Sequence, residues 1–197
     1  GERAGTPVIF SHIGPQGRQN YRTGGPAAAK LIEEARARGV NVMAALHPYT
    51  STASSLRAYA IPGWAAEGGQ ARMLERFRDP AEVARLDRET MEMMQIRGGA
   101  EKIVFSDSRP QYNGKNLAQI AAEMSLPVPA AVRRILESGN ASVMNRDLYD
   151  LANIRYLSTR DWMMTCTDGG APNPAVAITH PRSYGAFTRK LRWLVLE

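Results

Sequence analysis

The first 46 residues alternate between apolar runs and a helical pattern, and this alternation constrains the fold more than any other feature. Residues 7–11 form a short apolar run typical of a strand buried on both faces. Small and aliphatic residues then recur at helical spacing between Pro26 and Gly39, and residues 40–46 form a second apolar run. Strand, helix and strand in this order predict a βαβ unit with a right-handed crossover and two parallel strands.

The rest of the chain continues this alternation. Further strands are predicted at residues 102–105 and 162–167, with a short apolar piece at 143–144 and a loop at 50–69. Helices are predicted at residues 79–97, 117–124, 129–137 and 146–153, and from Phe187 onward. The pattern indicates an α/β fold with a parallel sheet, either a (β/α)₈ barrel or an open doubly wound sheet.

Composition narrows the class of protein. The 197 residues are 44% hydrophobic and 22% charged, as in a globular chain with a real core. The formal charge of +6 comes from arginines scattered among acidic residues, so we expect no nucleic-acid partner. No apolar run approaches the roughly 20 residues that cross a bilayer, so we expect no membrane partner and no signal peptide. A single Cys166 excludes an internal disulfide, and we expect a cytoplasmic protein.

Three polar residues stand just past the C-terminal ends of predicted strands: His12, His47 and Asp168. Active sites lie at this end of the strands in barrels and in open α/β sheets. Imidazole and carboxylate groups suit Zn²⁺, whose catalytic sites keep one position open for water. Taken singly, each histidine fits a structural role and Asp168 fits a turn, but together they suggest an incomplete zinc site.

Longer motifs occur along nearly the whole chain. They are Ser11-His12, His47-Pro48-Tyr49-Thr50, Pro62-Gly63-Trp64-Ala65 with Glu67-Gly68-Gly69, Thr167-Asp168-Gly169, and His180-Pro181-Arg182-Ser183-Tyr184-Gly185-Ala186-Phe187. In this order they resemble the D-aminoacylase branch of the amidohydrolase superfamily, the N-acyl-D-amino-acid deacylases. The last motif is the most specific of them.

The resemblance implies a zinc-bearing (β/α)₈ barrel that hydrolyses the amide bond of N-acyl-D-amino acids. It implies that His12 is a zinc ligand after the fifth strand, that His47 can bind a second metal position after the sixth, and that Asp168 ends the eighth. Residues 1–197 are then expected to be the C-terminal half of a barrel, about strands 5 to 8 with their helices. The first strands, with their His-x-His pair and cysteine ligand, and the small β-sandwich are not expected in this sequence. Cys166 is interpreted as a core residue of the last strand.

The resemblance also implies a mechanism in which metal-activated water attacks the amide carbonyl. Asp168 would take the proton of the water and pass it to the leaving amine. Arg182 is a candidate clamp for the carboxylate of a small-molecule substrate, with a surface ion pair as the alternative. Tyr184 is a candidate substrate-binding residue, with a role in shaping its loop as the alternative. Many relatives have Tyr-Pro-Tyr at residues 47–49, so His47 is a departure from the family pattern.

Two other functions stay open. One is a cyclic-amide hydrolase of the hydantoinase or dihydroorotase kind on the same barrel, because fold and metal do not fix the substrate. The other is a metal-free barrel protein without catalysis. The isolated 197-residue chain is expected to be inactive, and the sequence does not indicate an oligomeric state.

Overall fold

The computed structural model describes residues 1–171 and 173–196, which form two compact units. Unit 1 combines residues 1–51 with the described parts of 147–172 and 179–197. Unit 2 combines Thr52–Arg146 and Asn173–Ile178. The chain thus leaves unit 1 after residue 51 and returns to it about a hundred residues later, an organisation that the sequence pattern did not indicate.

The sheet of unit 1 consists of β1 (Val8–Phe10), β2 (Val42–Leu46) and β6 (Met163–Thr165). All are parallel, in the order β1-β2-β6, with Ala44 paired to Phe10 on one side and to Met163 on the other. The predicted βαβ unit is therefore confirmed. The described parallel sheet has three strands, however, and not the four expected for barrel strands 5 to 8.

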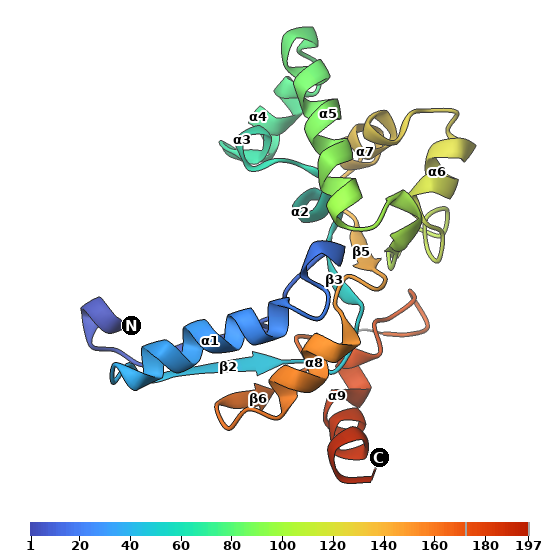
Figure 1. Ribbon diagram of the computed structural model, residues 1–197. Coiled ribbons are helices and arrows are strands. Elements are labelled where there is room, and N and C mark those ends of the chain that lie inside the picture. Colours follow the sequence, from blue (N-terminus) through green and yellow to red (C-terminus); the bar gives the residue numbers. More distant parts are fainter. Residues whose placement is uncertain (172, 197) are drawn as a thin grey trace. The chain divides into compact units, whose positions relative to one another are not determined.

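Helices α1 (Gly24–Ala37) and α8 (Leu151–Ser158) lie side by side along this sheet (Figure 1). Their close approach depends on Gly25, whose backbone N–H donates to Asn153 Oδ1 at 3.0 Å. A Cβ on Gly25 would lie 3.0 Å from that oxygen and 3.1 Å from the Cα of Asn153, tighter than ordinary van der Waals contact. Glycine at this position therefore sets the distance between the two helices.

Two helix boundaries in unit 1 differ from the prediction. Helix α8 begins at Leu151, and not at residue 146, because Asp150 caps it by accepting from the backbone N–H of Ala152 at 3.3 Å. Helix α9 (Arg182–Leu191) begins five residues before Phe187 and continues into a π-helical turn, Arg192–Leu196. Short 3₁₀ turns occur at Glu2–Ala4 and Arg18–Asn20.

The core of unit 1 lies between the sheet and helices α1 and α8. Its members include Ala29, Ile32, Val42, Leu46, Leu157 and Trp162. Among the described residues, no helix is both long and apolar enough to cross a lipid bilayer.

The sheet of unit 2 is antiparallel, in the order β3 (Thr52–Ser55), β5 (Ser142–Asn145) and β4 (Ile103–Phe105). The prediction that residues 102–105 form part of a parallel sheet is wrong, because an apolar run indicates burial but not the direction of the partner strand. The loop predicted at residues 50–69 is also wrong. This segment contains β3 and two short helices, α2 (Leu56–Ala60) and α3 (Gly63–Ala66).

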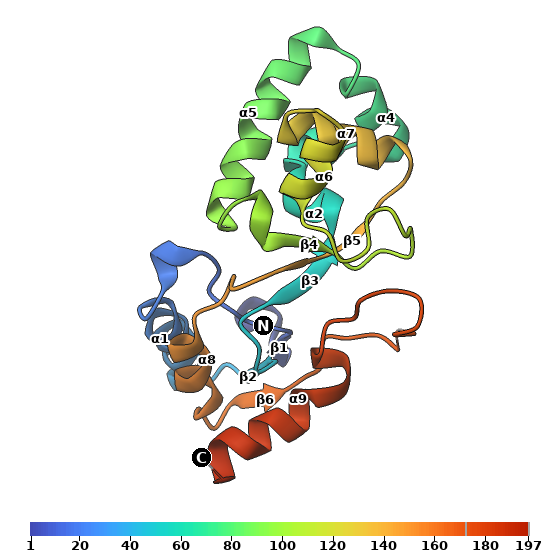
Figure 2. The same ribbon diagram turned by 90° about the vertical axis from the view of Figure 1, so that its right-hand side faces the viewer.

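Most of the longer helices of unit 2 pack against one another, and one of them also contacts the sheet (Figure 2). They are α4 (Gly69–Arg76), α5 (Pro80–Ile96), α6 (Leu117–Glu123) and α7 (Val128–Glu137), with a 3₁₀ turn at Ala100–Lys102. Helix α5 begins as predicted, with Asp79 accepting from the N–H of Ala81 at 2.9 Å. The buried core includes Leu56, Leu86, Ile103, Phe105, Ile120 and Ile135.

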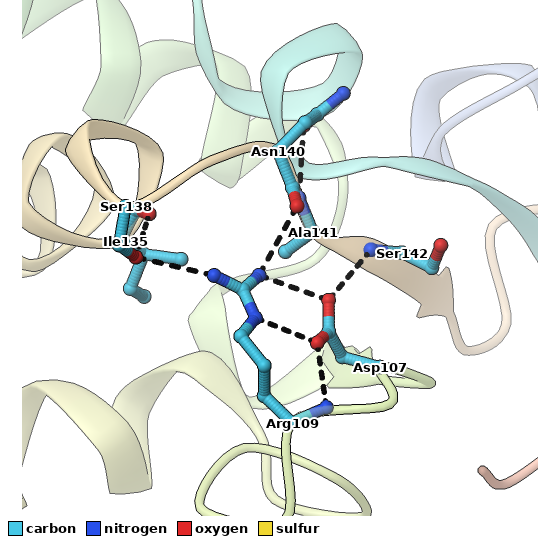
Figure 3. A network of polar contacts seen from close by, with 7 residues as sticks. All are labelled: Asp107, Arg109, Ile135, Ser138, Asn140, Ala141 and Ser142. Atoms are coloured by element: carbon cyan, nitrogen blue, oxygen red, sulfur yellow. Dashed lines mark hydrogen bonds and ion pairs between the residues drawn. The ribbon is translucent and has the colours of Figure 1, made fainter. Parts of the chain in front are cut away.

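A polar network connects the segment after β4 with the start of β5 in unit 2 (Figure 3). The Asp107 carboxylate accepts from Arg109 Nε at 2.7 Å and Nη2 at 2.9 Å, and from the backbone N–H of Ser142 at 3.2 Å. Arg109 Nη2 also donates to the carbonyl oxygen of Asn140 at 3.1 Å. Burial opposes the charge of Asp107, but the hydrogen bonds from Arg109 and Ser142 outweigh it and lower the pKa of the carboxyl. The network ties the segment after β4 to the start of β5.

Candidate functional site

The three polar residues expected at strand ends all lie in unit 1. His12 follows β1, His47 follows β2 directly, and Asp168 follows β6. Because neighbouring parallel strands end at the same edge, these positions share one edge of the sheet. The structure brings His12 and Asp168 together, with His12 Nε2 lying 4.0 Å from Asp168 Oδ1.

The backbone turns sharply at both residues. His12 has φ 43° and Asp168 has φ 46°, in the left-handed region that residues other than glycine seldom adopt. Such conformations cluster at functional sites, where the surrounding structure holds them. The next residue, Gly169, is also constrained, because a Cβ there would lie 2.5 Å from Ser183 Oγ in helix α9. The loop after β6 is thus held closely against the start of α9.

Arg182, the first residue of α9, connects two of the three strand ends. Its Nη1 lies 2.6 Å from Asp168 Oδ2 and 3.2 Å from His47 Nε2. Arg182 is only 6% exposed and the Asp168 side chain is 29% exposed, so the ion pair is partly buried and the alternative of a surface ion pair is wrong. Its expected role as a clamp for the substrate carboxylate stays a prediction.

A group of aromatic rings surrounds His47, which is fully buried at 0% exposure. The ring centres of Tyr149 and His180 lie 5.8 Å and 5.9 Å from that of His47. Burial, followed by the nearby charge of Arg182, lowers the pKa of His47 from 6.5 to about 3. His47 is therefore neutral at physiological pH.

His180 is held by two backbone groups. Its Nδ1 accepts from the N–H of Arg182 at 3.0 Å, and its Nε2 lies 3.0 Å from the carbonyl oxygen of Ser51. Since a carbonyl can only accept, Nε2 carries the proton. Burial lowers the pKa of His180 from 6.5 to about 4.

The chain is similar to known proteins in sequence and in structure. No family model matches the chain. The chain is 28% identical over 199 residues to N-acyl-D-glutamate deacylase of Alcaligenes xylosoxydans xylosoxydans, covering 100% of this chain and 32% of that protein. It is 26% identical over 191 residues to N-acyl-D-aspartate deacylase of the same organism, covering 96% and 30%. The chain thus spans about a third of the length of the curated relatives it matches.

Solved structures agree with these sequence matches. N-acyl-D-glutamate deacylase from Bordetella bronchiseptica, complexed with zinc and a phosphonate inhibitor, aligns with TM-score 0.66 and 23% identity over 96% of this chain and 31% of that one. A D-aminoacylase with a binuclear metal centre aligns with TM-score 0.62 and 22% identity over the same shares. Both comparisons point to the N-acyl-D-amino-acid deacylases. The resemblance inferred from the motifs is confirmed, as are the α/β class and zinc as a metal of the family.

The zinc of the deacylases can be tested against the donors present here. His12 and Asp168 supply an imidazole and a carboxylate 4.0 Å apart, and both are donor types that zinc accepts. Within the described ranges, no group of three or more His, Cys, Asp or Glu side chains is arranged to hold a metal ion. The His12–Asp168 pair therefore fits part of a zinc donor set, whereas the catalytic zinc sites of enzymes generally use three protein ligands.

Three further residues refine the comparison between sequence and site. Cys166, expected inside the last strand, follows β6 and is half-buried, and burial raises the pKa of its thiol. Tyr184 is 62% exposed on α9, and its expected substrate contact stays a prediction. Tyr49 was expected only as part of a motif, without a role of its own. Its hydroxyl lies 3.4 Å from the carbonyl oxygen of Pro181, and a Cβ on Gly185 would lie 2.7 Å from that hydroxyl, so the glycine of the C-terminal motif was the available signal.

Proposed function

We propose that this chain forms part of the active site of a zinc-dependent amidohydrolase that hydrolyses the amide bond of N-acyl-D-amino acids. The observation that carries the proposal is the convergence of His12 and Asp168 at the ends of β1 and β6, 4.0 Å apart. In this proposal His12 is a zinc ligand and Asp168 is the acid–base group. The similarity to N-acyl-D-glutamate deacylase, which extends over the whole of this chain, supports the choice of substrate.

We further propose that the parallel sheet belongs to a (β/α)₈ barrel. Consecutive strands of such a barrel are neighbours, and β2 pairs with both β1 and β6. If β6 is the eighth barrel strand, then β2 is the seventh and β1 is the sixth. His12 would then follow the sixth strand, instead of the fifth as the resemblance first implied.

The roles of the residues follow from their contacts. Asp168 Oδ2 is bound to Arg182, so Oδ1, on the side of His12, is the oxygen that would take a proton from water and return it to the leaving nitrogen. When bound, zinc would supply a Lewis acid that polarises the amide carbonyl and lowers the pKa of water. The left-handed backbone at His12 and Asp168 would hold both side chains in place at the end of the sheet.

The test uses the complete protein that contains this chain, purified with zinc. It would be assayed for amine release from N-acetyl-D-glutamate, N-acetyl-D-aspartate and a neutral N-acetyl-D-amino acid, with the L-enantiomers as matched controls. We expect hydrolysis of a D-substrate, loss of activity with a chelator and recovery with added zinc.

The same assay separates the other candidate functions. Ring opening of a hydantoin or dihydropyrimidine, without hydrolysis of linear amides, would indicate a cyclic-amide hydrolase. A protein that binds no metal and turns over none of these substrates would indicate a non-catalytic barrel protein.

A further inference from the structure

We propose that His47 is a positioning residue, which holds Arg182 against Asp168 through a hydrogen bond. The inference deepens the proposed function and rests on it for the role of Asp168. It gives His47 a task different from the metal binding that its place at a strand end suggested.

The hydrogen bond fixes which nitrogen of His47 carries its proton. The Arg182 guanidinium has only donors, so His47 Nε2, 3.2 Å from Arg182 Nη1, must accept. In neutral imidazole the proton then lies on Nδ1, which is buried and has no hydrogen-bond partner among the described residues. The Nε2 lone pair is thus directed at Arg182 and the Nδ1 position is protonated, so this tautomer offers no lone pair to a metal ion.

Two acceptors locate Arg182 Nη1 more tightly than one. This nitrogen carries two hydrogens, and it lies within hydrogen-bonding distance of two acceptors, Asp168 Oδ2 at 2.6 Å and His47 Nε2 at 3.2 Å. A carboxylate alone accepts a guanidinium in several orientations. The imidazole, fixed by its burial among aromatic rings, selects the orientation in which Nη1 lies between the two strand ends.

The backbone of Arg182 is fixed as well. Its N–H donates to His180 Nδ1, and His180 is anchored by the carbonyl oxygen of Ser51. Both ends of Arg182 are thus held by histidines. With Oδ2 of Asp168 bound to this fixed group, Oδ1 is left on the side of His12, 4.0 Å from its Nε2. His47 would therefore act on Asp168 through Arg182.

The arrangement predicts opposite tautomers for two neighbouring histidines. His47 should carry its proton on Nδ1, and His180 should carry its proton on Nε2. Long-range ¹H–¹⁵N spectra of the complete protein, labelled at histidine nitrogen, would show this directly, with signals assigned by their loss in His47→Gln and His180→Gln. A proton on Nε2 of His47, or a change of its signals typical of ligation when zinc is added, would overturn the proposal.

A matched pair of variants tests the positioning role. The side-chain amide of Gln can present an acceptor near the position of His Nε2, whereas that of Asn reaches only the position of Nδ1. We expect kcat to fall about tenfold in His47→Asn, because the general base loses its fixed orientation, and to stay within about threefold of wild type in His47→Gln. Both variants should bind zinc as the wild type does, whereas His12→Ala should bind it at least about tenfold more weakly.

The outcomes separate the two proposals. Zinc loss in both His47 variants would make His47 a ligand and overturn the positioning role. A raised KM with unchanged kcat in His47→Asn would place Arg182 on the substrate and also overturn it. If the wild-type protein hydrolyses no N-acyl-D-amino acid, the proposed function fails. The tautomers of His47 and His180 would still test the hydrogen-bond arrangement, because that experiment needs no substrate.

Discussion

The two units use the carboxylate of an aspartate in different ways. In unit 1, Asp168 follows a parallel strand and keeps one oxygen directed toward His12. In unit 2, Asp107 follows an antiparallel strand, and both of its oxygens are bound by Arg109 and by backbone. Neighbouring parallel strands end at one edge of the sheet, where side chains from distant segments can form an active site. In the antiparallel sheet of unit 2, the polar residues instead link neighbouring strands. We therefore expect changes in unit 1 to alter catalysis and changes in unit 2 to alter stability.

The largest effect is expected for Asp168→Asn in the complete protein. Asparagine keeps the shape of the side chain and can still accept from Arg182, but it cannot take a proton. Turnover should fall at least about a hundredfold, the usual scale for loss of an acid–base group, while the fold and most of the zinc remain. Steady-state kinetics and metal analysis would measure this. The control is Asp161→Asn, which changes an exposed carboxylate of unit 1. Wild-type activity in Asp168→Asn would leave the residue with only a structural role.

A second large effect is expected for His12→Ala. Its imidazole is 54% exposed, so little packing is lost, and an effect on zinc would reflect coordination. Zinc affinity should fall at least about tenfold, and activity should fall with it. Mutation of residues that only support metal ligands already weakens metal binding by about tenfold, and removal of a ligand itself should cost more. Zinc titration of the apoprotein would measure the change. Unchanged zinc affinity would show that His12 is not a metal ligand. It would also contradict the expectation that changes in unit 1 alter catalysis.

Contiguous patterns made part of this structure predictable. The strand, helix and strand between residues 7 and 46 are adjacent in the sequence, and their hydrophobic spacing identified them. Once the strands were located, His12, His47 and Asp168 could be placed at strand ends. The sheet of unit 2 was not predictable in this way. Its strands are short and distant in sequence, so their pairing depends on tertiary contacts that periodicity does not encode.

The contacts within the site could not be predicted for the same reason, because they also depend on tertiary contacts between distant segments. Arg182 lies 135 residues from His47, so nothing in the local sequence indicated that the two side chains would meet. His47 at a strand end looked like a ligand because composition and position suit zinc. Only the spatial neighbour of Nε2 distinguishes a ligand from an acceptor that is already occupied. Residue types and strand ends could thus be predicted, but the connections among these side chains could not.

A change in unit 2 should give the opposite result to those in unit 1. Asp107→Asn removes the charge that binds Arg109 and weakens the link between β4 and β5. The free energy of unfolding should fall by about 1–3 kcal/mol, the cost of leaving buried polar groups without partners. Denaturant unfolding would measure it. Glu123→Gln, which breaks an exposed ion pair with Lys115, is the matched control and should cost less than about 0.5 kcal/mol. A loss of zinc in Asp107→Asn without a loss of stability would contradict the division of roles.

The smallest effect concerns the pH dependence of stability in unit 1. The pKa of His180 is lowered by burial from 6.5 to about 4, so between these values the unfolded chain binds a proton that the folded chain does not. Stability from this residue is therefore present above pH 6.5 and is lost as the pH falls toward 4. From the two pKa values, the loss between about pH 6.5 and about pH 5.5 should be about 1 kcal/mol. Since Gln does not titrate, His180→Gln should unfold with a shallower pH dependence than wild type over this window, while carboxylate titrations common to both proteins cancel. Parallel pH profiles for the two proteins would mean that His180 is accessible to protons in the folded state, and that its bonds to Ser51 and Arg182 do not hold it neutral.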